Sequence, residues 1–137
     1  MTQFGDHQPA VVLLAEDDEI NQQIVRYILS DLAFINLVIA PDGKAALEAA
    51  LSQRFDLMIF DRHMPLISGD RVIRHLRASQ TINSGTPIIQ FTADADHTSI
   101  GTAGAGHADA VVPKPVQGDQ LRAAVLHLLD RHRRNKS

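Results

Sequence analysis

The chain has 137 residues, 45% of them hydrophobic, and a net charge of -3, which favours about one globular domain and excludes wholesale disorder. This weak acidity gives no indication of a nucleic-acid or membrane partner, and the absence of cysteine excludes disulfides, thiolate catalysis and Cys-based zinc sites. No apolar stretch approaches the ~20 residues of a membrane span and the polar head lacks a signal-peptide core, so the sequence predicts a soluble, cytoplasmic protein.

Strand-like and helix-like patterns alternate from the start of the chain. Residues 11–15 form an apolar run that predicts a buried strand and leads into Glu16, Asp17 and Asp18. Asp17 or Asp18 is available as the N-cap of the helix that follows. This helix is predicted from apolar residues at helical spacing, namely Ile20, Ile24, Tyr27, Ile28 and Leu32.

The middle of the chain continues the alternation. Residues 35–39 predict a second strand, and a Pro-Asp-Gly turn leads to an alanine-rich helix over 44–51. Residues 57–61 predict the third strand, followed by a loop with two breakers. The next helix is expected to turn Val72, Ile73 and Leu76 inward and to end at the turn of residues 83–85.

The last third of the chain predicts two more strands, at residues 87–91 and 110–112, and a final helix over 118–133. Residues 94–107 lie between these strands and hold three glycines but a single large apolar residue, Ile100. Because each interior glycine costs a helix about 1 kcal/mol relative to alanine, we expect a short, loosely packed fourth helix there.

Five strands alternating with five helices predict an α/β fold with a doubly wound, five-stranded parallel sheet covered on both faces. The flavodoxin-like (βα)5 arrangement with strand order 2-1-3-4-5 is favoured. The expected organisation is a disordered head over residues 1–8, one domain over 9–133 and a basic tail over 134–137.

Four of the predicted strands end at residues that can handle a phosphoryl group or a divalent cation. Glu16 and Asp17 follow the first strand, Asp61 ends the third, Thr92 follows the fourth and Lys114 the fifth. Ligands of such sheets bind outside the carboxyl ends of the strands. Carboxylates crowded there repel one another unless a cation neutralises them, and an oxygen-only ligand set suits Mg²⁺.

Each of these residues also has a structural explanation when considered alone. The acids after the first strand are suitable helix caps, Lys114 is an ordinary loop lysine and Thr92 an ordinary strand-end residue. Asp61 is harder to explain, because solubility does not require an acid directly after four apolar residues. Lys114 stands between two prolines, and the Lys114-Pro115 bond is a candidate for the cis isomer.

As a set, these motifs resemble the receiver domain of bacterial response regulators over about residues 9–133. The matching segments are Leu13-Leu14-Ala15-Glu16-Asp17, Asp61-Arg62-His63-Met64-Pro65 with Gly69, Thr92-Ala93 and Lys114-Pro115. The separations between them along the chain also fit the family. Residues 18–22 are most similar to receivers attached to hybrid histidine kinases.

The resemblance implies a role for each matching residue. Asp61 would be the phosphoacceptor, and Glu16, Asp17, Asp61 and the backbone carbonyl of His63 would bind Mg²⁺. The Thr92 hydroxyl and the Lys114 amine would contact the phosphoryl group. The chain would act as a signalling domain that catalyses only its own phosphotransfer and autodephosphorylation.

The resemblance also implies partners. The donor would be a phosphohistidine on a histidine kinase or a histidine phosphotransfer protein. Output would pass to a downstream protein effector or to fused domains missing from this sequence. No nucleic-acid or membrane partner is expected, and homodimerisation through the fourth and fifth elements stays open.

Three positions depart from the family or vary within it. Val111 occupies the place of the family's aromatic switch residue, which acts together with the threonine at position 92. Valine has little reach, so we hypothesise that output runs through residues 94–106 instead. His63 and Asp94 stand where side chains influence hydrolysis of the acyl phosphate, although both are equally well explained as solvated loop residues.

Other functions remain alternatives. A receiver fold can act as a scaffold that binds partners without phosphorylation, although every acceptor-site residue is retained here. A haloacid-dehalogenase-type phosphatase requires a second acid two residues after the nucleophile, where this chain has His63. Flavin binding would call for a glycine-rich phosphate loop after the first strand and more aromatic residues.

Overall fold

The computed structural model describes residues 9–92 and 108–136, and in these ranges it forms a parallel sheet flanked by helices. The elements in chain order are β1 (Ala10–Ala15), α2 (Glu19–Leu29), β2 (Ile35–Ala40), α3 (Gly43–Ser52), β3 (Leu57–Asp61), α4 (Gly69–Ala78), β4 (Ile88–Thr92), β5 (Ala110–Pro113) and α5 (Gly118–Lys136). The head over 1–8 and the helix predicted over 94–107 lie outside the described residues.

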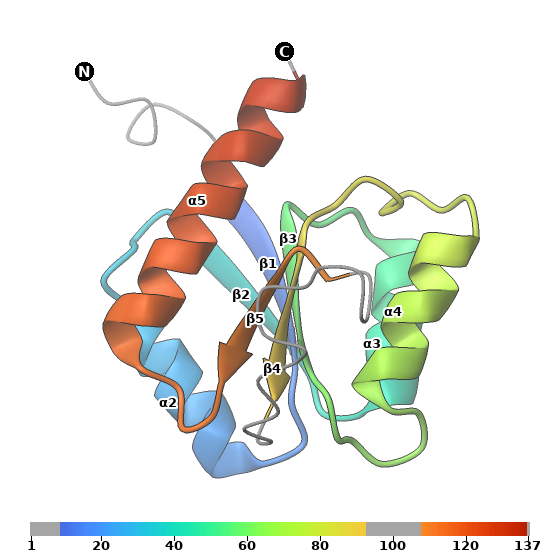
Figure 1. Cartoon of the computed structure of the whole chain (residues 1–137), viewed down its shortest axis with the longest axis horizontal. Coiled ribbons are helices and arrows are strands. Elements are labelled where there is room, and N and C mark those ends of the chain that lie inside the picture. Colours follow the sequence, from blue (N-terminus) through green and yellow to red (C-terminus); the bar gives the residue numbers. More distant parts are fainter. Residues whose placement is uncertain (1–8, 93–107, 137) are drawn as a thin grey trace.

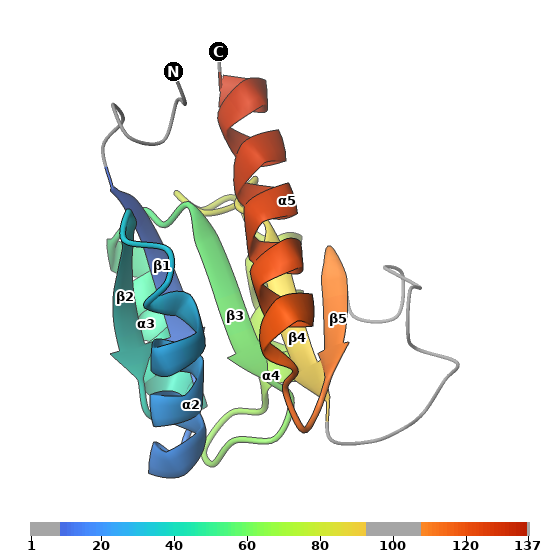
Figure 2. The ribbon, with the colours of Figure 1, turned by 90° about the vertical axis from the view of Figure 1, so that its left-hand side faces the viewer.

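The sheet has the predicted topology. Its strand order is β2-β1-β3-β4-β5, and every neighbouring pair is parallel. Figure 1 shows three layers, with α2 and α5 on one side of the sheet and α3 and α4 on the other. Turning the molecule brings α2 and α5 in front of the strands (Figure 2). The prediction of a doubly wound α/β fold is therefore confirmed.

Each face of the sheet carries its own hydrophobic core, because side chains of a strand alternate between faces. In β1, Val12 and Leu14 pack with α2 and α5, whereas Leu13 and Ala15 pack with α3 and α4. All four of these side chains are fully buried. This two-sided burial explains why the strands read as unbroken apolar runs in the sequence.

The helix α2 buries a different face from the one suggested by its apolar spacing. Its buried residues are Val25, Ile28 and Leu29. Ile20 is 71% and Tyr27 80% exposed, so of the apolar residues that predicted the helix only Ile28 is buried within it. The helix has two apolar stripes, and packing against the sheet and α5 selects one of them.

Polar side chains cap the helices that begin at the carboxyl ends of the strands. Asp18, not Asp17, is the N-cap of α2 and accepts a hydrogen bond of 2.8 Å from the Ile20 amide. Ser68 caps α4 in the same manner through the Arg71 amide. Because Asp18 serves the helix, the carboxylate of Asp17 is available for another role.

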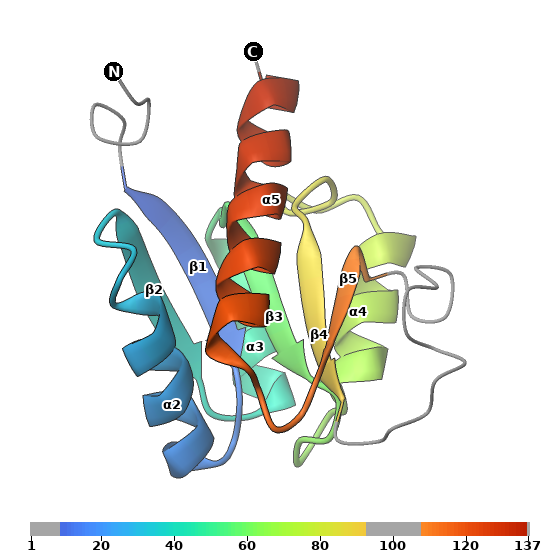
Figure 3. The ribbon, with the colours of Figure 1, turned by 60° about the vertical axis from the view of Figure 1, so that its left-hand side comes forward.

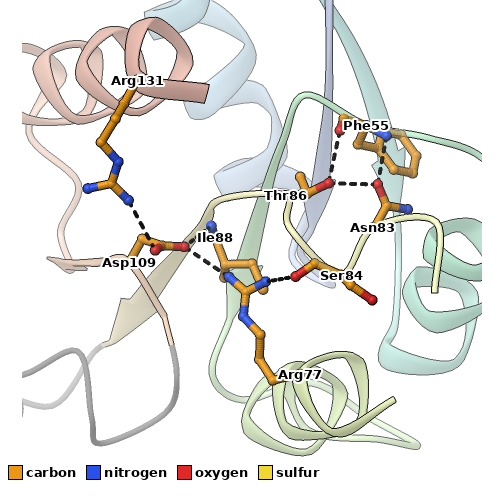
Figure 4. A network of polar contacts seen from close by, with 8 residues as sticks. All are labelled: Phe55, Arg77, Asn83, Ser84, Thr86, Ile88, Asp109 and Arg131. Carbon is orange, nitrogen blue, oxygen red and sulfur yellow. Dashed lines mark hydrogen bonds and ion pairs between the residues drawn. The ribbon is translucent and has the colours of Figure 1, made fainter. Parts of the chain in front are cut away.

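The five strands run toward one end of the molecule, and α5 returns along the sheet to the opposite end (Figure 3). We call these ends the carboxyl edge and the amino edge of the sheet. At the amino edge, the buried Asn83 joins three segments of chain: it donates to the carbonyls of Ala50 and Gln53 and accepts from the Phe55 amide. Figure 4 shows part of this network.

Candidate functional site

The sheet brings the predicted site residues to its carboxyl edge. Glu16 directly follows β1, Asp61 ends β3, Thr92 ends β4, and Lys114 directly follows β5. Strands β1, β3, β4 and β5 are consecutive neighbours in the sheet, so segments far apart in sequence meet at one place. The parallel topology alone is what aligns these strand ends.

Three carboxylates converge in this pocket. One oxygen each from Glu16, Asp17 and Asp61 lies within 4.8 Å of the others. Glu16 and Asp61 are buried, while Asp17 is exposed at the mouth. Glu16 Oε2 accepts a hydrogen bond of 3.2 Å from the Asp18 amide, but the buried Oε1 has no hydrogen-bond partner among the described residues.

Lys114 supplies the positive charge of the pocket. Its Nζ lies 3.0 Å from Asp61 Oδ2 and 3.4 Å from Glu16 Oε1, the second being an ion pair without a hydrogen bond. The Lys114 amide donates a 2.8 Å hydrogen bond to the Thr92 carbonyl, which anchors the backbone that carries the amine. The Lys114-Pro115 peptide bond is cis.

The electrostatics of the pocket reflect burial and crowding. Burial raises the pKa of Glu16 from 4.5 to about 7, and the neighbouring negative charge of Asp61 contributes to this rise. The hydrogen bond from the Asp18 amide and the positive charge of Lys114 act in the opposite direction but are outweighed. For Lys114, burial opposes the charged form, but the hydrogen bond and charge of Asp61 and the charge of Glu16 outweigh it, so its pKa is raised. One ammonium therefore faces three carboxyl groups.

This arrangement fits a divalent cation. The donors are carboxylate oxygens, one of which is buried without a hydrogen bond, and the negative charge exceeds that of the lysine. Mg²⁺ prefers such hard oxygen ligands and retains several waters, which the exposed position of Asp17 permits. The residues present are thus chemically suited to the ion expected from the sequence.

The loop after β3 packs directly beneath Asp61. An ideal Cβ placed on Gly69 would lie only 2.1 Å from the carbonyl oxygen of Asp61, so this close approach requires glycine. The Gly69 amide donates to the Arg62 carbonyl at 3.0 Å. The exposed His63 has its amide 3.5 Å from Asp61 Oδ1, which places its backbone beside the pocket.

The remaining predicted residues have different positions. Thr92 is buried at the end of β4, next to β3 and β5. Val111 lies within β5, partly buried and paired in register with Gln90. Asp94 and the rest of residues 94–106, the segment expected to carry the output, lie outside the described residues. The structural roles of these residues stay predictions.

The sequence did not indicate one polar connection next to the pocket. Arg62, the residue after Asp61, forms an ion pair of 3.0 Å with Asp70 at the start of α4, and Asp70 also accepts a hydrogen bond from Gln90. Gln90 is buried between the apolar Ile89 and Phe91 of β4. That amide at a core position was the available signal, because buried amides require partners.

None of the helices in the described part of the chain is long and apolar enough to cross a membrane. The exposed apolar residues instead include a stripe on α2 formed by Ile20, Ile24 and Tyr27. We call it the α2 stripe. It begins two residues after Asp18, beside the carboxylate pocket.

Comparison with known proteins gives consistent matches. The family model of the response regulator receiver domain matches residues 12–126. The chain is 28% identical to the chemotaxis protein CheY of Pseudomonas aeruginosa over 88% of its length and 96% of that protein. It is 32% identical to the autoinducer 2 sensor kinase/phosphatase LuxQ of Vibrio vulnificus, matching 90% of this chain but only 14% of LuxQ.

A solved structure shows the same fold. The receiver domain of the sensor histidine kinase PA1611 from Pseudomonas aeruginosa, which has a magnesium ion in its active-site cleft, superimposes with a TM-score of 0.78. It is 24% identical, and the match covers 89% of this chain and 98% of that one. With five parallel strands in the order 2-1-3-4-5 and a family model that matches most of its length, this chain belongs to the response regulator receiver domain family of two-component systems.

Proposed function

We propose that this receiver domain accepts a phosphoryl group on Asp61 in a reaction that depends on Mg²⁺. The observation that supports the proposal is the pocket itself. Asp61 is buried between two further carboxylates and a lysine, with its Oδ2 3.0 Å from the Lys114 amine. Four buried apolar residues precede this acid in β3, so the strand places its carboxylate directly at the carboxyl edge.

The proposed chemistry is nucleophilic transfer. An oxygen of the ionised Asp61 forms a bond to phosphorus while the phosphorus–nitrogen bond of a phosphohistidine breaks, and the imidazole leaves with its electron pair. The transition state spreads charge over the phosphoryl oxygens, so positioning and electrostatics supply most of the catalysis. Lys114 would neutralise one of those oxygens, and the hydroxyl of Thr92 would contact another.

The metal would share this task. Glu16, Asp17 and Asp61 would hold Mg²⁺ together with the backbone carbonyl of His63, and the ion would neutralise phosphoryl charge when bound. Beyond its own phosphotransfer and autodephosphorylation, no catalytic activity is proposed for the domain. A cytoplasmic location remains part of the prediction.

The α2 stripe supports a protein as phosphodonor. Ile20 and Tyr27 are mostly exposed, and Ile24 also lines a small pocket of about 90 Å³ with Glu16 and Lys114. A helical surface of a histidine kinase or phosphotransfer protein could cover these apolar residues while it places its phosphohistidine over Asp61. This docking would desolvate the site and favour transfer.

The consequence of phosphorylation stays a prediction as well. The chain spans about half of one response regulator, ArlR of Staphylococcus saprophyticus (52%), and 14% of LuxQ. Output through fused domains or through a separate effector protein is therefore proposed. We propose that output runs through residues 94–106, because Val111 stands in place of the aromatic switch residue. We also propose that His63 and Asp94 influence hydrolysis of the acyl phosphate.

The proposal is tested by incubation with acetyl phosphate and Mg²⁺, followed by intact mass spectrometry. Wild-type protein should gain one phosphoryl group, and the gain should disappear in Asp61→Asn and in the presence of EDTA. Asp31→Asn removes an exposed carboxylate beyond the opposite end of α2 from Asp17 and is the matched control. A mass gain that persists in Asp61→Asn would contradict the assignment of the acceptor.

The main competing function is a scaffold that binds partners without phosphorylation. Beryllofluoride with Mg²⁺ mimics the phosphorylated aspartate, and amide chemical shifts around Asp61 should respond to it. A domain that neither binds beryllofluoride nor becomes labelled would favour the scaffold.

A further inference from the structure

A second cavity lies at the amino edge of the sheet, opposite the carboxylate pocket. It has a volume of about 390 Å³ and is lined by residues that precede β4 and β5 and by the last turns of α5. A smaller cavity of about 240 Å³ adjoins it and shares Gly85, His132 and Asn135 with it. We call the two together the amino-edge cleft. Their size falls within the range of small-molecule sites.

The cleft contains more positive than negative charge. Arg77 from α4 and Arg131 from α5 approach the carboxylate of Asp109 from opposite sides, at 2.9 and 3.4 Å (Figure 4). Asp109 also accepts a hydrogen bond from the Ile88 amide at 2.8 Å. Among the described residues that line the cleft, three are arginines, namely Arg54, Arg77 and Arg131, and one is an acid, Asp109.

The two arginines differ in how firmly they are held. Arg77 is largely buried and also donates to the Ser84 carbonyl at 2.9 Å, which fixes its position at the wall of the cleft. The side chain of Arg131 is 54% exposed and reaches Asp109 only through the longer contact. Arg131 is therefore able to turn part of its guanidinium toward a ligand while Arg77 remains in place.

One face of α5 adds further polar groups to the same cleft. His132 and Asn135 line it, and His132 Nε2 lies 4.0 Å from Asp56 Oδ1 at the far side. The other oxygen of Asp56 is occupied by the Val11 amide. Leu128 and Pro87 also line the cleft but are buried, whereas Ile82 in the smaller cavity is an exposed apolar side chain. Gly85 leaves open space in the cleft, since a Cβ there would meet nothing within 4 Å.

We infer that the amino-edge cleft binds a small phosphate monoester. A phosphate carries close to two negative charges and three acceptor oxygens, and the planar fork of arginine matches it. Arg131 would provide the main contact, with Arg77 fixed behind it and Asn135 beside it. The exposed Ile82 would contact the organic part of the ligand. This site is separate from Asp61 and would give the domain a second input.

The test uses the whole chain and amide-resolved NMR titration at physiological salt. The probes are adenosine 5′-monophosphate, glucose 6-phosphate, adenosine and inorganic phosphate. At least one of the two monoesters should shift the amides of Ile88, Asp109 and Arg131 and bind more tightly than adenosine or inorganic phosphate. Absence of shifts there with both monoesters at millimolar concentration would overturn the inference.

Two variants examine the site by different means. Arg131→Gln removes charge and Gly85→Phe fills the space, and each should weaken monoester binding by about tenfold or more. Arg74→Gln, an exposed arginine of α4 outside the cleft, is the matched control and should change nothing. Labelling of Asp61 by acetyl phosphate should be normal in all three proteins, which shows that they are folded. Equal binding by Arg131→Gln and wild type, or equal binding of inorganic phosphate and the monoesters, would also refute the inference.

Discussion

At the scale of single residues, Glu16 carries the least favourable environment in the carboxylate pocket. It is fully buried, and its pKa lies near 7 in the folded protein against 4.5 for the free side chain. Between these values the folded protein binds more protons than the unfolded chain, so the free energy of unfolding falls as the pH rises. The contribution of protonated Glu16 to the free energy of unfolding is complete below about pH 4.5 and is lost by the time the pH passes 7.

Glu16→Gln should therefore remove a pH dependence. Without metal, urea denaturation should show wild type losing stability relative to the variant between about pH 5 and about pH 8, by on the order of 3 kcal/mol. Glu48→Gln changes an exposed acid of α3 and should leave the wild-type profile intact. Parallel pH profiles for wild type and Glu16→Gln would contradict the raised pKa.

Gly69 illustrates how closely the backbone supports the acceptor. In Gly69→Ala the new methyl group would meet the carbonyl oxygen of Asp61 at 2.1 Å, so the loop or β3 must move. We expect a loss of about 2 kcal/mol or more in unfolding free energy and slower labelling by acetyl phosphate. Gly85→Ala adds the same methyl group where there is open space, and its stability should change by less than about 0.5 kcal/mol.

At the scale of elements, Asn83 holds the end of α3 to the start of β3 and to the turn before β4. It makes hydrogen bonds of 2.6 to 3.0 Å with Ala50, Gln53, Phe55 and Thr86 while fully buried. Asn83→Ala would leave several of these groups buried without partners. The expected loss is about 3 kcal/mol in urea denaturation, against little change for the exposed Asn36→Ala.

The sequence predicted the elements well where burial was two-sided and poorly where a helix carried two apolar stripes. The strands were recognisable because both of their faces are buried, as Leu13 and Leu14 show on opposite cores. In α2 the spacing of Ile20, Ile24 and Tyr27 is as regular as that of the buried Val25 and Leu29. Only the position of the sheet and α5 decides which stripe is covered.

The candidate site was predictable for a related reason. In a parallel sheet the order of strands determines which strand ends are neighbours, so Asp61 and Lys114 could be brought together from the sequence alone. The connection from Arg62 through Asp70 to Gln90 could not, because it depends on how far α4 approaches β4. Contacts of this kind depend on the distance at which a helix packs on the sheet. The spacing of residues along the sequence carries no information about that distance.

At the scale of the whole molecule, metal binding should stabilise the fold. An ion that binds only the folded state adds about 2.7 kcal/mol when its free concentration is a hundred times its Kd. Thermal unfolding followed by circular dichroism should therefore show Tm rising with Mg²⁺. Asp17→Asn should shift this rise to higher Mg²⁺ concentration, whereas Asp31→Asn should not. A Tm independent of Mg²⁺ would argue against the metal site.

The contact between Glu16 and Lys114 also has a consequence for biosynthesis. The two residues meet at 3.4 Å, yet one follows the first strand to leave the ribosome and the other follows the last. A nascent chain that ends before β5 has its acids but no ammonium beside Asp61. We therefore expect that a truncated or partly translated chain is not phosphorylated on Asp61. Only the completed chain should take part in signalling.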